Sequence, residues 1–263
     1  MLARYLATSQ MKRTLRSILT RLGLYFIIRA LIKTLTYNRK TWLGFKYLKG
    51  QGIEIGALNA PLVTLPWIKV DYLDRLTVPQ LRRQYPELGN YPLVPVDILD
   101  DGESLKTIKN NSRDFIIAHH FLEHCQDPIG TINHQLKALK KSGILYLAIP
   151  DCRFNVDAGI PPTTLNHLIN DHQKTPKNSY RHHIYNWAFF VDKKQNRALS
   201  NHINRLIKIN YSIHFHQWTE KELKEFFAYL QRNLKTPFTL KEFIFNKKEY
   251  LVVIQKENHR VKV

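Results

Sequence analysis

Short apolar runs separated by polar, helix-like segments occupy the chain from residue 52 onward. The runs predict strands, and most of them end in an acidic residue or a turn. They cover residues 52–55, 67–73, 91–96, 114–118 and 144–149. Helical spacing between them predicts helices over residues 78–85 and 125–140. Strands and helices that alternate in this way predict a doubly wound, parallel α/β sheet.

The last part of the chain predicts a different strand arrangement. Thr219 and Glu222 form a capping-box motif, which predicts a helix over residues 223–230. Two further apolar runs, at residues 238–245 and 250–256, flank a polar turn and predict an antiparallel hairpin. The predicted fold class is therefore α/β, with a mostly parallel seven-stranded sheet that includes an antiparallel strand from this hairpin.

Residues 152–210 interrupt the strand–helix alternation. The segment is polar, rich in Asn, His and Lys, with helical patches at residues 165–172 and 185–206. We expect a helical insertion or lid over the carboxyl edge of the sheet. His182 and His183 lie in this insertion, where they could contact a substrate or only fill a polar helix surface.

The beginning of the chain is strongly basic. Residues 1–53 contain 11 Lys and Arg and no Asp or Glu, so they hold more than half of the net charge of +19. Apolar residues between positions 15 and 35 recur at helical spacing, which predicts a basic amphipathic extension over residues 1–45, ahead of one domain over residues 46–263. Its basic face could be solvated, could contact an anionic membrane peripherally or, less favoured, could bind nucleic acid.

The sequence also limits the cellular setting. The apolar run at residues 23–32 is split by Arg29 and is much shorter than the ~20 residues of a membrane span. No small-residue cleavage site follows it, so a secretory signal fits poorly. Cys125 and Cys152 are too few for a disulfide framework or a structural zinc site. We expect a cytoplasmic protein, with peripheral membrane attachment as the alternative.

The first predicted strand ends in a tight turn. Glu54 lies at the strand tip, Gly56 follows two residues later, and Ala57 and Leu58 come next. Ligands bind outside the carboxyl ends of strands in open α/β sheets. One glycine is too few for a dinucleotide fingerprint, so the turn alone is a weak signal of a nucleotide-like ligand.

Four motifs in order resemble those of the S-adenosylmethionine-dependent methyltransferases with a Rossmann-like fold, in particular the type 11 small-molecule branch. They are the acid–glycine turn at residues 54–58, Leu-Asp at residues 73–74, the strand and Leu-Glu-His at residues 114–124, and the Gly–strand–Pro segment at residues 141–150. The resemblance extends over about residues 49–256. It implies S-adenosylmethionine as the cofactor.

The resemblance also implies roles for individual residues. Asp74 would accept hydrogen bonds from the ribose hydroxyls, although it could instead cap the next helix, and Asp71 is the reserve candidate. Asp97 would bind the adenine amine, with Asp100 and Asp101 as local competitors. Glu54 would hold turn amides or the cofactor's ammonium group. The full predicted cofactor-binding set is Glu54, Gly56, Ala57, Leu58, Asp74, Asp97 and His119.

Candidate catalytic groups follow two of the predicted strands. Methyl transfer is an in-line displacement that mainly demands orientation, but a base helps when the acceptor is a hydroxyl or an amine. His119 and His120 suit that task because histidine titrates near neutral pH, and Asp151 is a third candidate. All three could instead only line the pocket. Glu123 and His124 are expected to anchor the start of the following helix.

Histidine spacing raises the question of a metal. His120 and His124 lie four residues apart, and His214 and His216 lie two apart. Zinc sites use such pairs, but no cysteine pair or close carboxylate completes either one in the sequence. We therefore predict no metal site.

The predicted function is methyl transfer from S-adenosylmethionine to a small molecule or a glycan or lipid-linked precursor, bound under the insertion. An RNA methyltransferase is the alternative enzyme, although Ala-His-His-Phe at residues 118–121 differs from a base-methylation motif. Leu58 and Ala60 stand where the family has glycines. A non-catalytic binding module on the same fold is therefore a further alternative.

Overall fold

The computed structural model describes residues 38–257 of the chain. The chain divides into two units between Lys46 and Tyr47. The described part of the first unit, residues 38–46, contains all of helix α3, Arg39–Tyr47, except its last residue. The amphipathic helices predicted between residues 15 and 35 lie outside the described residues. Within residues 38–257, every helix is too short or too polar to cross a membrane.

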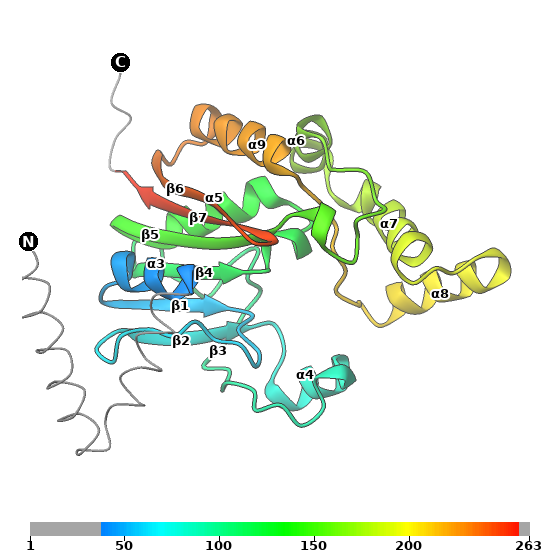
Figure 1. Ribbon diagram of the computed structural model, residues 1–263, viewed down its shortest axis with the longest axis horizontal. Coiled ribbons are helices and arrows are strands. Elements are labelled where there is room, and N and C mark those ends of the chain that lie inside the picture. Colours follow the sequence, from blue (N-terminus) through cyan, green and yellow to red (C-terminus); the bar gives the residue numbers. More distant parts are fainter. Residues whose placement is uncertain (1–37, 258–263) are drawn as a thin grey trace, which may run out of the picture. The chain divides into compact units, whose positions relative to one another are not determined.

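The second unit is built on a single seven-stranded sheet, in the order β3-β2-β1-β4-β5-β7-β6 (Figure 1). Neighbouring strands from β3 to β5 pair in parallel, whereas β7 pairs antiparallel with both β5 and β6. This arrangement confirms the predicted fold class. The strands are β1 Gln51–Ile55, β2 Lys69–Asp74, β3 Ile98–Leu99, β4 Arg113–His119, β5 Leu139–Pro150, β6 Phe238–Asn246 and β7 Glu249–Lys256.

Helices connect several of the strands of the sheet. The α-helices of this unit are α4 Val78–Gln84, α5 Pro128–Ala138, α6 Leu165–Lys174, α7 Lys177–Asn186, α8 Asn196–Lys208 and α9 Glu220–Asn233. Short turns of other helix types are η1 Pro86–Leu88, η2 Leu122–His124, η3 Cys152–Phe154 and the π-helical turn η4 Trp187–Val191.

One face of the sheet packs against α5, α6 and α9 (Figure 1). The apolar residues of α9 recur every three or four positions, and Leu223, Phe226, Phe227 and Leu230 are all buried against the sheet. Thr219 and Glu222 form the predicted capping box at the start of α9. At α5 the Asp127 carboxylate accepts a hydrogen bond from the Gly130 amide, 2.9 Å away, so polar caps begin both helices.

The strand predicted at residues 91–96 is wrong. The structure has no strand there, and β3 is only Ile98–Leu99. Pro92 and Pro95 lack amide hydrogens, so this stretch cannot form a regular ladder of hydrogen bonds. The apolar residues around the prolines belong to the loop that leads into β3.

The insertion forms its own small hydrophobic core. Ile184 and Ala188 pack with Ile203 and Leu206, and this cluster also buries Ile213 and Phe215 from the segment that follows the insertion. The helix predicted over residues 185–206 is instead divided among α7, η4 and α8. Figure 1 shows α7 and α8 beyond the carboxyl ends of β1 and β4. The insertion thus positions residues 210–215 next to that edge of the sheet.

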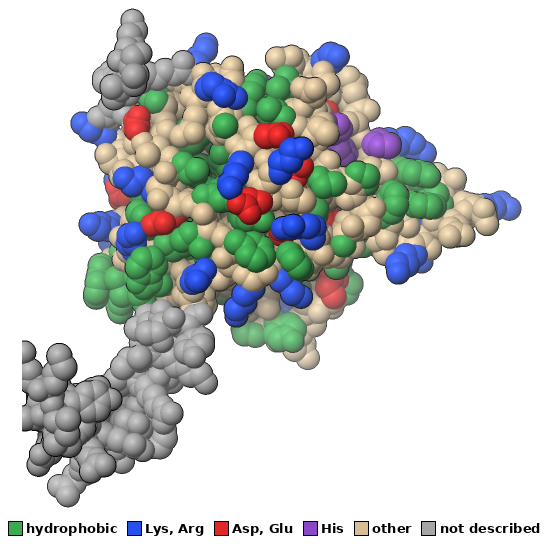
Figure 2. Space-filling view, turned by 45° about the horizontal axis from the view of Figure 1, so that its top comes forward, with side chains coloured by type: hydrophobic (Ala, Val, Ile, Leu, Met, Phe, Trp, Pro, Cys, Tyr) green, Lys and Arg blue, Asp and Glu red, His purple; other side chains and the backbone are tan. Residues whose placement is uncertain are grey.

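Charged side chains of both signs lie on the face of the described part that Figure 2 shows. On the face shown in Figure 2, basic and acidic side chains are interspersed and form no continuous basic patch. This distribution agrees with the sequence, in which the basic excess is concentrated in residues 1–53.

Candidate functional site

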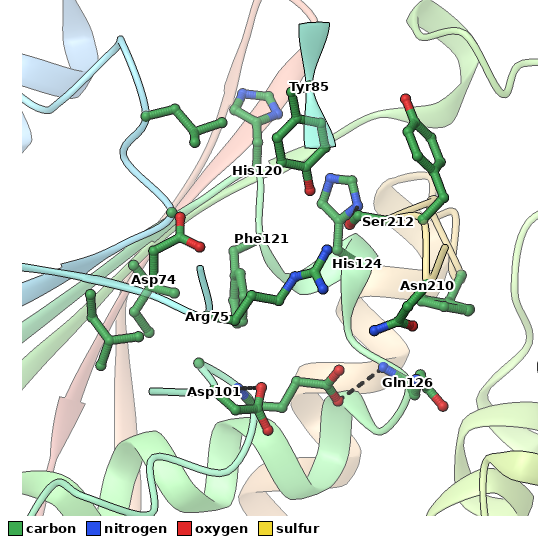
Figure 3. Close-up of a pocket in the computed structure, with 18 residues that line it drawn as sticks. Asp74, Arg75, Tyr85, Asp101, His120, Phe121, His124, Gln126, Asn210 and Ser212 are labelled. Atoms are coloured by element: carbon green, nitrogen blue, oxygen red, sulfur yellow. Dashed lines mark hydrogen bonds between the residues drawn. The ribbon is translucent and has the colours of Figure 1, made fainter. Parts of the chain in front are cut away.

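A cavity of about 570 Å³ opens at the carboxyl ends of β1, β2 and β4. The turn after β1, the end of β2, residues 101–103 and the segment after β4 form one side of it. Residues 210–215 form the opposite wall (Figure 3). Small-molecule sites typically enclose about 300–1,000 Å³. The cavity is therefore large enough for a cofactor and lies at the edge where ligands bind in open α/β sheets.

Gly56 brings bare backbone to the cavity wall. Its φ is +65°, and its amide donates a hydrogen bond to the Leu73 carbonyl at 2.9 Å. No heavy atom lies within 4 Å of the place where a Cβ would stand. Glycine adopts this left-handed conformation without steric cost, so the turn leaves open space for a bound group to approach the backbone.

Glu54 holds the backbone of this turn through its carboxylate. Its side chain is buried, and both carboxylate oxygens accept from the Leu62 amide, at 2.9 and 3.2 Å. Of the two roles predicted for Glu54, the structure shows a contact with a turn amide. Neither Glu54 nor Ala57 lines the cavity.

Leu58 lines the cavity in a conformation that glycine would normally adopt. Its φ is +50°, and its carbonyl accepts a hydrogen bond from the Val94 amide at 2.9 Å. A left-handed conformation costs a non-glycine residue about 1–2 kcal/mol. The turn therefore keeps the backbone path of a glycine-rich motif although a leucine stands there.

Asp74 ends β2 in the cavity wall (Figure 3). Its Oδ1 accepts from the Leu76 amide at 3.2 Å, so it also shapes the turn that leads to α4. Burial raises the pKa of Asp74, against the opposing effects of nearby amides and the Arg75 charge. Asp71, the reserve candidate, points elsewhere and forms an ion pair with Arg113 at 2.6 Å.

Of the three acids considered for the adenine amine, only Asp101 lines the cavity. The carboxylate of Asp97 instead accepts from the Tyr72 amide at 2.9 Å, on the backbone of β2. The carboxylate of Asp100 accepts from the amide and hydroxyl of Thr107, both at 2.7 Å. The role predicted for Asp97 stays a prediction, and the geometry favours its competitor Asp101.

Glu103 is a cavity residue that the sequence did not indicate. One carboxylate oxygen accepts from the amides of Gln126 and Asp127, at 3.0 and 3.3 Å. Burial raises its pKa to about 7, and the charges of Asp101 and Asp127 add to this effect against the two amides. Its only local signal was Gly102 between two acids, in a loop whose path the sequence does not determine.

The two candidate histidines at the end of β4 differ in position: His119 is its last residue, and His120 follows it. His120 lines the cavity with a left-handed φ of +49°, and its Nε2 lies 2.8 Å from a Glu249 oxygen. Its Nδ1 lies 3.5 Å from a carboxylate oxygen of the buried Glu123. His119 is outside the lining and packs edge-on against Tyr146, with 4.5 Å between ring centroids.

Asp151 lies outside the cavity lining and is fully buried. Its carboxylate pairs with Arg153 at 2.6 Å and accepts from the Tyr250 hydroxyl at 2.9 Å. Burial alone would raise the pKa of Asp151, but the hydrogen bonds and charge of Arg153 outweigh it and lower the pKa. This geometry gives Asp151 a structural partner at the end of β5.

Polar and aromatic side chains line the cavity beside residues 210–215. Arg75, Tyr85, Asn210 and Ser212 line it, and Figure 3 shows the Arg75 side chain directed into the cavity. Tyr85 packs edge-on against Tyr211. The sequence predicted a lid over this edge without indicating which of its residues would reach the cavity.

Neither a protein-family model nor a curated protein matches the sequence. Many solved structures resemble the fold. A methyltransferase of Methanosarcina mazei is 17% identical, covering 81% of this chain and 96% of its own, with a TM-score of 0.43. A methyltransferase of Aquifex aeolicus is 9% identical, covering 85% of this chain and 92% of its own, with a TM-score of 0.46. A Rhodobacter sphaeroides protein described as a Zn-dependent alcohol dehydrogenase is 11% identical, covering 84% of this chain and 90% of its own, with a TM-score of 0.51.

At these identities the likeness shows the fold alone, and the strand order decides between fold types. The order β3-β2-β1-β4-β5-β7-β6, with β7 antiparallel, is typical of S-adenosylmethionine-dependent methyltransferases. The chain has the methyltransferase fold. The resemblance inferred from the sequence motifs is therefore confirmed at the level of structure.

Within the described residues, two groups that contain histidines bring their potential ligand atoms within 4.8 Å of one another. The first group is Glu123, His124 and His214. Each of its members also has a partner outside the group. Glu123 faces His120, His124 contacts the Ile213 carbonyl, and His214 contacts Asp157. The second is His167 with His183 and His216. His214 and His216 belong to different groups because residues 211–217 are not a strand, so two-residue spacing does not align their side chains.

Proposed function

We propose that the chain is a methyltransferase that binds S-adenosylmethionine in the cavity at the ends of β1, β2 and β4. The observation that supports this most directly is the meeting of Asp74 with the open backbone of Gly56 in one cavity at that edge. Asp74 would accept hydrogen bonds from the ribose hydroxyls, as acids at this place do in nucleotide sites. Asp101 would meet the adenine amine.

The remaining walls suit the same cofactor. Ile55, Leu73 and Phe121 line the same cavity as the two acids and offer apolar surface to an adenine ring. Gly56 leaves space for the amino-acid end of the cofactor. When bound, S-adenosylmethionine supplies a methyl group made electrophilic by its sulfonium.

His120 is the residue best placed to accept a proton from a hydroxyl or amine acceptor. It lines the cavity, and its two ring nitrogens face Glu249 and Glu123. The two carboxylates therefore hold the imidazole ring in place at the cavity wall. The left-handed backbone at His120 is a strained feature of the kind that clusters at functional sites.

The acceptor would occupy the end of the cavity next to residues 210–215. Arg75, Tyr85 and Asn210 offer charge, an aromatic ring and an amide there. A guanidinium favours partners with a carboxylate or phosphate. We propose a small polar acceptor with an anionic group, which includes phosphate-bearing glycan or lipid-linked precursors.

Calorimetric titration with S-adenosylmethionine tests the proposal. Wild type should bind, and Asp74→Asn should weaken binding at least about tenfold, because hydrogen bonds to charged groups contribute about 1.5–3 kcal/mol. Asp71→Asn is the matched control on the same strand, since Asp71 pairs with Arg113 outside the cavity. Absence of binding by wild type, or equal weakening by both substitutions, would contradict the proposal.

A further inference from the structure

The second histidine group joins the insertion to the segment before α9. His167 and Asp171 lie one turn apart on α6, so both face the same side of that helix. His183 comes from α7, and His216 comes from the irregular stretch that precedes α9. Four potential ligands thus converge from three separate segments.

Three of the distances between these groups are close to those around a tetrahedral ion. The Nε2 atoms of His167 and His183 are 3.1 Å apart, and the Asp171 Oδ2 lies 3.1 Å from the former and 3.7 Å from the latter. Metal–ligand bonds of about 2.0–2.1 Å at tetrahedral angles place neighbouring ligand atoms about 3.3 Å apart. A ligand atom of His216 lies within 4.8 Å of those of the other two histidines.

Two polar atoms of these four residues are buried without a hydrogen-bond partner. They are the Asp171 Oδ2 and the His216 Nδ1, and these residues are 5% and 0% exposed. Buried polar atoms in native proteins nearly always have a partner. Because the Asp171 oxygen approaches the histidine nitrogens without hydrogen-bond geometry, a cation between them would satisfy all of these atoms together.

Surrounding groups orient the ligands as they do in metal sites. The Ser179 hydroxyl donates to the Asp171 Oδ1 at 2.8 Å, which leaves Oδ2 for the centre of the group. The His216 Nε2 lies 3.4 Å from the Gln126 carbonyl, so it holds the proton and the Nδ1 keeps its lone pair.

We propose a structural zinc site with four protein ligands: His167, Asp171, His183 and His216. Three imidazoles and one carboxylate suit zinc, and four protein ligands leave no open position for catalysis. The ion joins α6 and α7 to the segment that contains Phe215, a cavity residue. It therefore fixes the insertion-side wall of the cavity. The sequence predicted no metal because these ligands are far apart along the chain.

Metal analysis of the untagged, full-length protein tests this site. After chelation, incubation with Zn²⁺ and removal of the excess, elemental analysis should find about one zinc per chain. His183→Ala should lose the zinc, whereas His182→Ala, at the exposed neighbouring position, should retain it. His214→Ala should also retain it, because His214 belongs to the other histidine group.

Two further measurements cover the case in which His183→Ala fails to fold. Ser179→Ala removes only the orienting hydroxyl and should weaken zinc binding about 10–100-fold. Wild-type protein loaded with Co²⁺ should show the strong visible absorption of a tetrahedral ion. Wild type that retains no zinc, a six-coordinate Co²⁺ spectrum, or loss of zinc in His214→Ala but not in His183→Ala would overturn the proposal.

Discussion

Replacing Glu103 by Gln should remove a pH dependence from the stability of the protein. The Glu103 carboxylate is held in the cavity wall by the amides of Gln126 and Asp127. Burial is the main cause that raises its pKa to about 7 from 4.5. Glutamine keeps an oxygen that can accept from the same amides, but it does not titrate.

The pKa values determine the sign and size of the effect. Between pH 4.5 and 7 the folded state binds more protons at this site than the unfolded state, so the free energy of unfolding falls as pH rises. The shift of 7 − 4.5 = 2.5 units corresponds to about 3.4 kcal/mol once the pH exceeds both values. Between pH 5 and pH 8 the loss from this group amounts to about 2.5 kcal/mol.

Urea unfolding of wild type and Glu103→Gln at pH 5 and pH 8 measures this difference directly. The advantage of the variant over wild type should grow by about 2.5 kcal/mol between the two pH values. Glu225→Gln, at an exposed position on α9, is the matched control and should change equally at both. If the stability difference between wild type and Glu103→Gln is the same at pH 5 and pH 8, the inferred burial of a protonated carboxyl is wrong.

Two further substitutions test the cavity and its surroundings. Gly56→Ala should cost about 1 kcal/mol of stability through its left-handed backbone and weaken S-adenosylmethionine binding at least about tenfold by calorimetry. Gly89→Ala is the control, because Gly89 also has a positive φ and free space around it but lies outside the cavity lining. This variant should lose stability and keep its affinity for S-adenosylmethionine. Equal affinity of the two variants would refute the role of Gly56 in binding. Asp151→Ala should lower the free energy of unfolding by about 2 kcal/mol, because the Arg153 and Tyr250 hydrogen bonds are lost, and should leave cofactor affinity unchanged. A strongly reduced affinity in that variant would show that Asp151 acts at the site.

The sheet could be predicted from the sequence because most of its strands are apolar runs that can be recognised from local sequence alone. The apolar run of β4 is buried on both faces, and the antiparallel hairpin has a polar turn between two apolar runs. The one wrongly predicted strand, at residues 91–96, has the apolar content of a strand but contains Pro92 and Pro95. Hydrogen bonding, which apolar periodicity does not report, decided that case.

The candidate site could be predicted only where its residues follow strand ends. Asp74 and His120 reach the cavity because parallel strands finish at one edge of the sheet. Asp101 and Glu103 depend on the path of a loop, and no periodic pattern determines such a path. The contribution of residues 210–215 depends on the packing of the insertion, which buries Ile213 and Phe215.

The two ends of the cavity therefore have different structural origins. The end at Gly56 is formed by turns directly attached to β1 and β2, whose positions the sheet hydrogen bonds determine. The end at Asn210 and Ser212 is formed by a segment positioned by the insertion, and fold alone does not determine what such a segment recognises. Under the proposed function, changes in the insertion should consequently alter which acceptor binds while leaving cofactor binding intact. This separation explains why the fold supports a proposal for the cofactor more strongly than one for the acceptor.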